Sequence, residues 1–406
     1  MLFRLEIDNF YSIGEPQVID LRVSGKVRGE SHRFGPIYPS SSEQVPKVIA
    51  VFGPNGSGKT TVLRALAFIA WFICDSFQLK PEDRLPFERF LGEPGSNRPT
   101  RLAVALGGAS DLENPDNESG GYGTYRYEVE FAKRPDGPAF VSAEVLSHRP
   151  HGARKGHRVF ERSDDGQVAE GRGFQLGRLS ALAEKIRPNA SVISTLAQFE
   201  FPPARTLRDA ARSMISNLLI VRQDYSDAQI TRLYADHSNY LDALNRDISR
   251  VDLGTKAMRV ERGEGPDGLV MLFDHDGLLR PIHWLLESHG TQSFVRTFPL
   301  IFSALSNGGV AVVDELDQSL HPLLLPEIAS WFYDPGRNRH DAQLWMTCQN
   351  ASFLEELEKE EVVFCQKDNS GITRVFSLSE IKGVRRIDNY YRKYISGTYG
   401  AVPNIG

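Results

Sequence analysis

The stretch VIAVFGPNGSGKTT, residues 48–61, decides the fold. Its first five residues are apolar, which predicts a strand covered on both faces. Gly53, Gly58, Lys59 and Thr60 then match the pattern G-x-x-x-x-G-K-[ST], in which backbone N–H groups and a lysine ammonium surround phosphate oxygens while the hydroxyl binds Mg²⁺. We therefore expect a phosphate-binding loop made of Gly53, Pro54, Asn55, Gly56, Ser57, Gly58, Lys59, Thr60 and Thr61.

The segment after this loop predicts a buried helix that extends to Ile73, because most of its residues are apolar. The N-terminus of that helix would point at the bound anion, where the helix dipole favours negative charge. The most apolar part, Val62 to Cys74, is interrupted by Arg64 and is too short to cross a bilayer. We expect no transmembrane segment.

A second apolar run, Val310–Val313, ends in Asp314 and Glu315. Nucleotide hydrolysis needs a further carboxylate at the Mg²⁺ ion and a base that orients and deprotonates water. We expect Asp314 to bind the metal together with Thr60, and Glu315 to be the base; an ordinary strand that ends in solvated acids is the alternative. Three polar residues would extend toward whatever faces the nucleotide: Asp317, Ser319 and His321. His321 also fits a surface position at the start of a helix.

The remaining sequence predicts an α/β fold with an antiparallel part and a helical insert. Alternating apolar residues predict antiparallel strands at 3–7, 19–23 and 101–146, and short apolar runs predict parallel strands at 310–313, 344–347 and 362–364. Helical spacing of Leu207, Ala211, Met214, Ile215 and Leu218 predicts a helix within the insert. We expect one domain, 1–406, with an N-terminal lobe (1–175), a helical insert (176–252) and a C-terminal lobe (253–406).

The overall composition names no partner. A formal net charge of −5 gives no general attraction to nucleic acid or to an anionic membrane. The most basic stretch, residues 148–158, could contact phosphate groups, but a solvated loop is the simpler interpretation. Cys74, Cys348 and Cys365 are too widely spaced for a disulfide framework or a paired-cysteine zinc site, so they predict a reducing cytoplasm.

The order of these motifs resembles that of the ABC-type ATPases, which include the SMC and RecF heads. Lys59 and Asp314 lie far apart with a helical insert between them, and ESHGTQ at 287–292 is similar to the signature usually written LSGGQ. The resemblance implies a P-loop fold of the ABC-ATPase head type with a mixed central sheet, and ATP and Mg²⁺ as ligands. It also implies a homodimer or larger homo-oligomer, because the signature of one head caps the γ-phosphate held by another.

Within this signature, Ser288 and Gly290 match the positions that would contact phosphate. A serine supplies a hydroxyl, and a glycine lets backbone N–H groups approach the phosphate at the start of a helix. His289 departs from the usual glycine. Pro299 would interrupt the following helix early.

Nearly the whole chain is similar to ATPases of bacterial defence and abortive-infection loci, of the AbiL/RloA type related to the Septu and PARIS ATPases. The likeness includes the opening strand and turn, the phosphate loop, the signature, residues 314–322 and the closing stretch YISGTYGAVP at 394–403. It implies a cytoplasmic ATPase that responds to a phage-derived trigger and controls a separate effector, such as a nuclease or toxin. The alternative is a DNA repair or maintenance head of RecF type that clamps nucleic acid.

One position departs from that family in a way that bears on chemistry. After the strand 344–347 the family usually has a histidine that contacts the γ-phosphate, whereas Gln349 stands here. A glutamine amide forms hydrogen bonds but carries no charge. We therefore expect Lys59, Glu315 and Gln349 to be the catalytic residues, and turnover to be slow.

Overall fold

The phosphate-binding loop follows the carboxyl end of an inner strand of a six-stranded sheet. The computed structural model describes residues 1–23, 32–92, 95, 98–133, 137–218, 220, 226–251, 254–263, 268–318 and 320–403. The strands of this sheet are, in spatial order, β11 (Met214–Ser216), β15 (Val310–Val313), β16 (Gln343–Thr347), β5 (Val48–Phe52), β17 (Val362–Lys367) and β18 (Thr373–Ser377). Neighbours run parallel except β17 and β18. The predicted parallel strands are confirmed.

A second sheet is antiparallel throughout, as the alternating apolar pattern predicted. Its spatial order is β10 (Val168–Glu170), β9 (His157–Arg162), β8 (Ala139–Pro150), β7 (Tyr122–Lys133), β6 (Thr100–Ala109), β1 (Leu2–Asp8) and β2 (Gln17–Asp20). The basic stretch 148–158 was expected to be a solvated loop. Only residues 151–156 form an exposed turn, because the ends of the stretch belong to β8 and β9. His148 is buried, with its ring stacked 4.3 Å from that of Tyr125.

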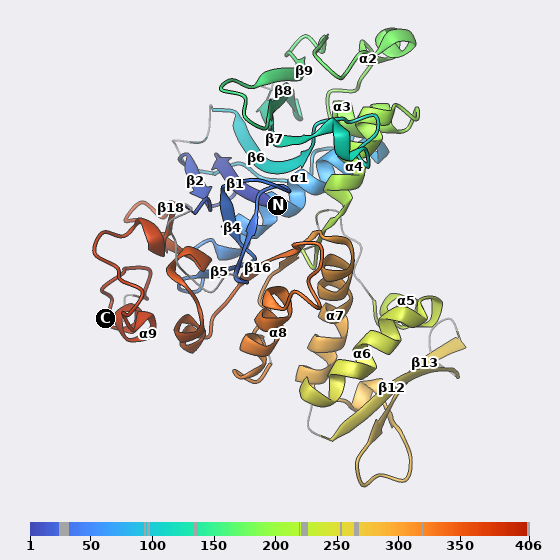
Figure 1. Ribbon diagram of the computed structural model, residues 1–406, viewed down its shortest axis with the longest axis vertical. Coiled ribbons are helices and arrows are strands. Elements are labelled where there is room, and N and C mark those ends of the chain that lie inside the picture. The colour runs from blue at the N-terminus through green and yellow to red at the C-terminus, as the bar shows by residue number, and fades with distance from the viewer. Residues whose placement is uncertain are drawn as a thin grey trace.

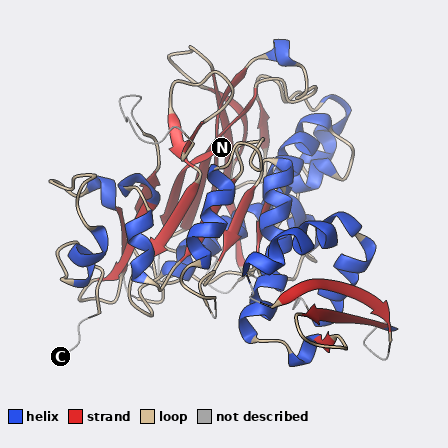
Figure 2. Cartoon of the chain, turned by 60° about the horizontal axis from the view of Figure 1, so that its bottom comes forward, coloured by secondary structure: helices blue, strands red, loops and turns tan. Residues whose placement is uncertain are grey.

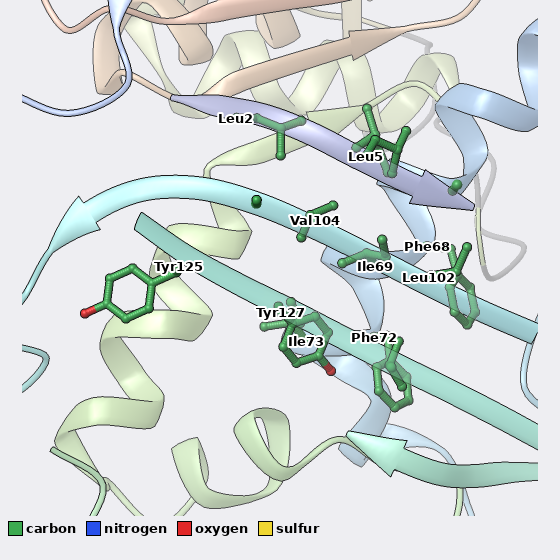
Figure 3. Close-up of a cluster of buried hydrophobic side chains, with 14 of the residues drawn as sticks. Leu2, Leu5, Phe68, Ile69, Phe72, Ile73, Leu102, Val104, Tyr125 and Tyr127 are labelled. Atoms are coloured by element: carbon green, nitrogen blue, oxygen red, sulfur yellow. The ribbon is translucent and has the colours of Figure 1, made fainter. Parts of the chain in front are cut away.

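Helix α1 (Lys59–Asp75) joins the two sheets in one core. Its side chains Phe68, Ile69 and Ile73 lie beside Leu5 of β1 and side chains of β6 and β7 (Figure 3). The segment Lys59–Gln78 is long and apolar enough to cross a membrane. However, 67% of its most apolar 18-residue stretch is buried inside the protein. A core helix of a folded domain meets the same criterion of length and composition.

The opposite face of the parallel sheet is covered by α7 (His289–Asn307) and α8 (Leu324–Tyr333). Alternate residues of β5 divide between the two faces, since Ile49 and Val51 pack with α1 while Phe52 packs with the other group. Helices therefore lie on both sides of the strands (Figure 2). The expected interruption at Pro299 is wrong, because α7 continues through this buried proline to Asn307.

The segment 176–252 contains helices, but β11 divides them into two groups. The first group is α2 (Ser180–Ala183), α3 (Val192–Ala197) and α4 (Pro202–Arg212), of which α3 and α4 contact α1. The second is α5 (Asp227–Asp236) and α6 (Ser238–Val251). The helix predicted through Met214 and Ile215 is wrong, because these residues pair with Val310 and Ala311 as an edge strand. The division into three parts at 175 and 252 stays a prediction.

The second helical group packs with a small antiparallel sheet. Its strands are β12 (Thr255–Arg262), β13 (Leu269–His275) and β14 (Ile282–His283). Figure 1 shows α5, α6, β12 and β13 at the end of the molecule opposite β8 and β9. The described part of the chain also contains the hairpin of β3 (Phe34–Pro36) and β4 (Gln44–Pro46), and α9 (Tyr390–Ile395) near the C-terminus. Short 3-10 helices occupy several of the connections.

Candidate functional site

The loop between β5 and α1 requires glycine at two positions because of its backbone shape. Gly53 and Gly58 have φ of 150° and 105°, in the region that side chains disfavour. A Cβ on Gly53 would lie 2.2 Å from the carbonyl oxygen of Cys365, and one on Gly58 would lie 2.4 Å from Oγ1 of Thr373. Both glycines therefore let β17 and β18 pack directly against the loop.

Lys59 begins α1 and is only 7% exposed. Its ammonium donates hydrogen bonds to the carbonyl oxygens of Gly53 at 2.8 Å and Pro54 at 3.1 Å. The ammonium is therefore bonded to two carbonyl oxygens of the loop to which Lys59 itself belongs. The loop borders a cavity of about 720 Å³, which most of the predicted phosphate-binding residues line: Asn55, Gly56, Ser57, Gly58, Lys59, Thr60 and Thr61.

The structure brings Thr60 and Asp314 together although they are distant in sequence. Oγ1 of Thr60 donates to Oδ2 of Asp314 at 2.9 Å. Thr347, at the end of β16, donates its hydroxyl to Oδ1 of Asp314 at 2.7 Å and accepts the N–H of Glu315 at 2.6 Å. One threonine hydroxyl therefore connects the side chain of one acid to the backbone of the next.

Glu315 lies at the turn that follows β15, with φ of 53°. A residue other than glycine in this region carries backbone strain, which neighbouring contacts must hold in place. Nε2 of Gln349 donates to Oε1 of Glu315 at 3.2 Å, and both residues line the cavity. The predicted base and the predicted third catalytic residue are thus adjacent.

The three polar residues after Glu315 do not all behave as expected. Asp317 points at the loop after β16, where Oδ2 accepts the N–H groups of Gln349 and Asn350 at 2.7 and 2.6 Å. It does not line the cavity. His321 accepts the N–H of Leu323, which fits a position at the start of a helix. Ser319 lies outside the described residues.

Besides Thr347, two supporting residues were not predicted from sequence. The side-chain amide of Asn217, just after β11, accepts the N–H of Asp314 at 2.8 Å and donates to its carbonyl oxygen at 2.9 Å. Thr373 donates to the carbonyl oxygen of Ser57 at 2.8 Å and to Oγ of Ser12 at 2.9 Å. No local pattern marks these residues, because each contact joins segments that are distant in sequence.

Ser288 and Gly290 lie elsewhere, at the start of α7. Ser288 is the N-cap of this helix, and its Oγ accepts the N–H of Thr291 at 3.1 Å. Gly290 falls in the first turn. Neither residue lines the cavity that holds Lys59. Within one chain, the signature and the phosphate loop therefore form separate surfaces.

The same cavity is also lined by Tyr11, Arg89, Phe90 and Leu91. The guanidinium of Arg64 lies 4.9 Å from the centre of the Tyr11 ring. Burial lowers the pKa of Arg89. An aromatic surface with a nearby cation suits a planar heterocycle.

The closing stretch 394–403 packs beneath the phosphate loop. The ring of Tyr394 stacks on that of Phe364 at 5.3 Å and lies 6.5 Å from that of Phe52, the residue before Gly53. Its hydroxyl donates to the carbonyl oxygen of Ala401 at 2.9 Å. This C-terminal stretch therefore supports the strand that carries the loop.

The residues present fit a Mg²⁺-bound nucleoside phosphate. A hydroxyl and a carboxylate, those of Thr60 and Asp314, meet at the loop, and such oxygen ligands suit Mg²⁺. Oγ of Ser57 is buried and has no hydrogen-bond partner within the described part of the chain. The glycine-rich backbone leaves room for phosphate at the N-terminus of α1. This donor set therefore fits phosphate and Mg²⁺.

The overall architecture is similar to that of solved SMC heads. A head domain from Thermotoga maritima has 16% identity and a TM-score of 0.41, with 93% of this chain and 98% of that chain covered. An SMC head bound to the C-terminal winged-helix domain of ScpA has 15% identity and a TM-score of 0.46, with 93% and 97% covered. A head with an extended coiled coil from Pyrococcus furiosus has 14% identity and a TM-score of 0.41, with 93% and 96% covered.

Family models match the sequence more directly, whereas no curated protein sequence matches it. A model described as "AAA domain" matches residues 4–86, which include β1 and the phosphate loop. A second model, described as "AAA domain, putative AbiEii toxin, Type IV TA system", matches residues 48–350. This match runs from β5 to the loop of Gln349 and so includes the phosphate loop, both acids and the signature. The chain belongs to this AbiEii-type AAA domain family, as the resemblance to abortive-infection ATPases predicted.

Proposed function

We propose that this chain binds ATP with Mg²⁺ and hydrolyses it slowly. The observation that carries the proposal is the series of hydrogen bonds from Thr60 through Asp314 and Thr347 to Glu315, beside the phosphate loop. This series fixes a metal carboxylate and a candidate base at one place. Phosphate binding alone requires neither, whereas hydrolysis requires both.

In this proposal the loop N–H groups and Lys59 hold the β- and γ-phosphates. Lys59 exchanges its bonds to the Gly53 and Pro54 carbonyls for bonds to phosphate oxygens, so nucleotide binding rearranges the loop. Glu315 accepts a proton from the attacking water, and the Gln349 amide orients the carboxylate or the water. When bound, Mg²⁺ neutralises charge on the phosphate oxygens.

The part of the cavity lined by Tyr11, Arg89 and Phe90 is the proposed site of the nucleobase. Tyr11 and Phe90 supply aromatic surface, and Arg89 supplies a cation within the same cavity. Stacking and cation–π contacts of this kind hold a planar base without selecting it strictly.

We propose that a second copy of the chain completes each site. Ser288 and Gly290 are separate from the cavity of their own chain, and Ser288 caps a long helix whose N-terminus can face an anion. In a homodimer or larger assembly, the signature of one copy would cover the γ-phosphate bound by another. ATP binding would then close the assembly, and hydrolysis would open it.

The proposed biological role is control of a partner in bacterial anti-phage defence. The family description names a putative toxin and a type IV toxin–antitoxin system, which supports a toxin–antitoxin context. The partner in this proposal is a separate effector, such as a nuclease or toxin. A phage-derived trigger would change the nucleotide state, and the effector would respond. The three free cysteines, all buried, fit a cytoplasmic location. The RecF-type alternative predicts salt-sensitive, ATP-dependent DNA binding.

Glu315→Gln is the test of this function. The variant keeps the shape of the side chain but removes the base, so we expect it to retain ATP and to stabilise the closed assembly. Lys59→Ala is the control, because it should lose nucleotide. Bound nucleotide and molecular mass are measured together, and the partner is co-purified from the native operon. Unchanged nucleotide retention and unchanged assembly in Glu315→Gln would show that Glu315 is not the base.

A further inference from the structure

Asp317 makes an unusual set of contacts for a residue so close to the site. Its Oδ2 accepts hydrogen bonds from the backbone N–H groups of Gln349 and Asn350 at 2.7 and 2.6 Å. The thiol of Cys348 donates to the same oxygen at 3.4 Å. Three consecutive residues after β16 are therefore held by one carboxylate from the turn after β15.

The two hydrogen bonds from the backbone N–H groups to Asp317 are short. Hydrogen bonds from backbone N–H groups to an ionised carboxylate are shorter and stronger than those between neutral groups. Cys348 is 1% exposed, so the contact is shielded from water on that side. Oδ1 of Asp317 is buried and has no hydrogen-bond partner among the described residues. All the described bonding of this carboxylate is thus directed at residues 348–350.

The segment that Asp317 holds carries the amide beside the base. The backbone N–H of Gln349 donates to Asp317, and the side-chain amide of the same residue donates to Glu315 at 3.2 Å. Asp317 and Glu315 belong to the same turn, in which the N–H of Gln318 bonds to the carbonyl oxygen of Glu315. The turn after β15 is therefore bonded to the loop after β16 at two places, through Asp317 and through Glu315.

We propose that Asp317 is a positioning residue that sets the place of the Gln349 amide relative to Glu315. It acts through the backbone of 348–350 and does not itself touch the nucleotide. This inference rests on the proposed hydrolysis of ATP. Without the Asp317 bonds, the loop has no charged acceptor for its N–H groups, and Gln349 samples positions in which it cannot reach Glu315.

The test is a double-mutant cycle. Asp317→Ala should lower the steady-state ATPase rate about tenfold, while the Kd for ATP changes less than about twofold, because the phosphate loop is untouched. In the Gln349→Ala background the same substitution should lower the rate less than about twofold, since the group that it positions is gone. A role in overall stability alone would lower the rate equally in both backgrounds.

Asp111→Ala is the matched control. Oδ1 of Asp111 accepts two backbone N–H groups, those of Glu113 and Asn114, in the loop after β6, away from the nucleotide cavity. It loses the same kind of contact as Asp317→Ala and should leave the rate unchanged. Asp317→Asn keeps the size and one acceptor oxygen, so it should fold if Asp317→Ala does not, and should show the same dependence on Gln349.

The outcomes separate the inference from the function on which it rests. Equal losses in both backgrounds, or a large loss of ATP affinity in Asp317→Ala, overturn the positioning role. An absence of hydrolysis by the wild-type chain overturns the proposed function and the inference with it. Hydrogen exchange gives a readout without turnover: exchange over residues 348–353 should be faster in Asp317→Ala, and unchanged exchange there overturns the inference.

Discussion

The side-chain amide of Gln349 donates to Oε1 of Glu315 at 3.2 Å, so a neutral group is next to the proposed base. A histidine at this position could also carry positive charge and stabilise the developing charge on the γ-phosphate. A glutamine offers the hydrogen bond without the charge. This relationship is the physical basis for expecting slow turnover.

The first prediction concerns this pair. Gln349→His should raise the steady-state ATPase rate severalfold, because an imidazolium adds charge where phosphate charge develops. Gln349→Asn is the matched variant: it keeps the amide but shortens the side chain, so it should lose the contact with Glu315 and lower the rate. A rate that does not rise in Gln349→His would mean that charge at this position does not limit turnover.

The second prediction concerns the shape of the loop. Gly53→Ala should abolish nucleotide binding and lower the melting temperature, because its Cβ would lie 2.2 Å from the carbonyl oxygen of Cys365. Gly56→Ala is the control. Gly56 also has positive φ, 75°, but nothing lies within 4 Å of its Cβ, so its cost is limited to backbone strain of about 1 kcal/mol. Equal effects of the two substitutions would contradict the steric argument.

The third prediction concerns Asp314, the proposed metal ligand. Asn217→Ala removes both side-chain bonds to the backbone of Asp314, so the Mg²⁺ concentration that half-saturates ATP hydrolysis should rise about tenfold. ATP binding in EDTA should not change, because the phosphate loop is intact. Asn245→Ala is the control, since Asn245 makes the same two-bond contact with the backbone of Met258. A rise of similar size in both variants would contradict a specific role for Asn217.

The phosphate loop and the two acids could be predicted because their chemistry fixes residue types at fixed spacing. Gly53, Gly58 and Lys59 are required by the loop itself, and Asp314 and Glu315 follow an unmistakable buried strand. The alternating strands were equally direct, since burial imposes a period of two. Local sequence is sufficient to predict an element when neighbouring residues in the chain determine its structure.

The sequence was insufficient where the deciding contact is distant. Met214 and Ile215 fit a helix by spacing, but an open edge of the parallel sheet pairs with them as β11. Asn217 and Thr347 acquire their roles only when β11, β15 and β16 lie side by side. Pro299 stays within α7 because tertiary packing of a buried helix outweighs the loss of one backbone hydrogen bond.

The fourth prediction concerns how the free energy of unfolding depends on pH through Glu144, in β8 of the antiparallel sheet. Burial raises the pKa of Glu144 to about 7, even though Arg162, the N–H of Val192 and the hydroxyl of Tyr127 all act to lower it. Well below pH 4.5, the ordinary pKa of this carboxyl, the group is protonated in both the folded and the unfolded state. As the pH rises toward 7 the unfolded chain releases the proton while the folded chain keeps it, so stability falls across this interval and is constant above it.

Glu144→Gln should therefore reduce the loss of unfolding free energy between pH 5 and 7 by at least about 1 kcal/mol. Melting temperatures measured across this pH range should accordingly fall less in the variant than in the wild type. Glu361→Gln is the matched variant, because burial also raises the pKa of Glu361 to about 7, just before β17, where Oε1 accepts the hydroxyl of Tyr333. Each variant is compared with the wild type at every pH, since His148, whose pKa burial lowers to about 4, contributes in the opposite direction. If the wild type and Glu144→Gln fall in parallel between pH 5 and 7, Glu144 is ionised in the folded protein and its pKa is not raised.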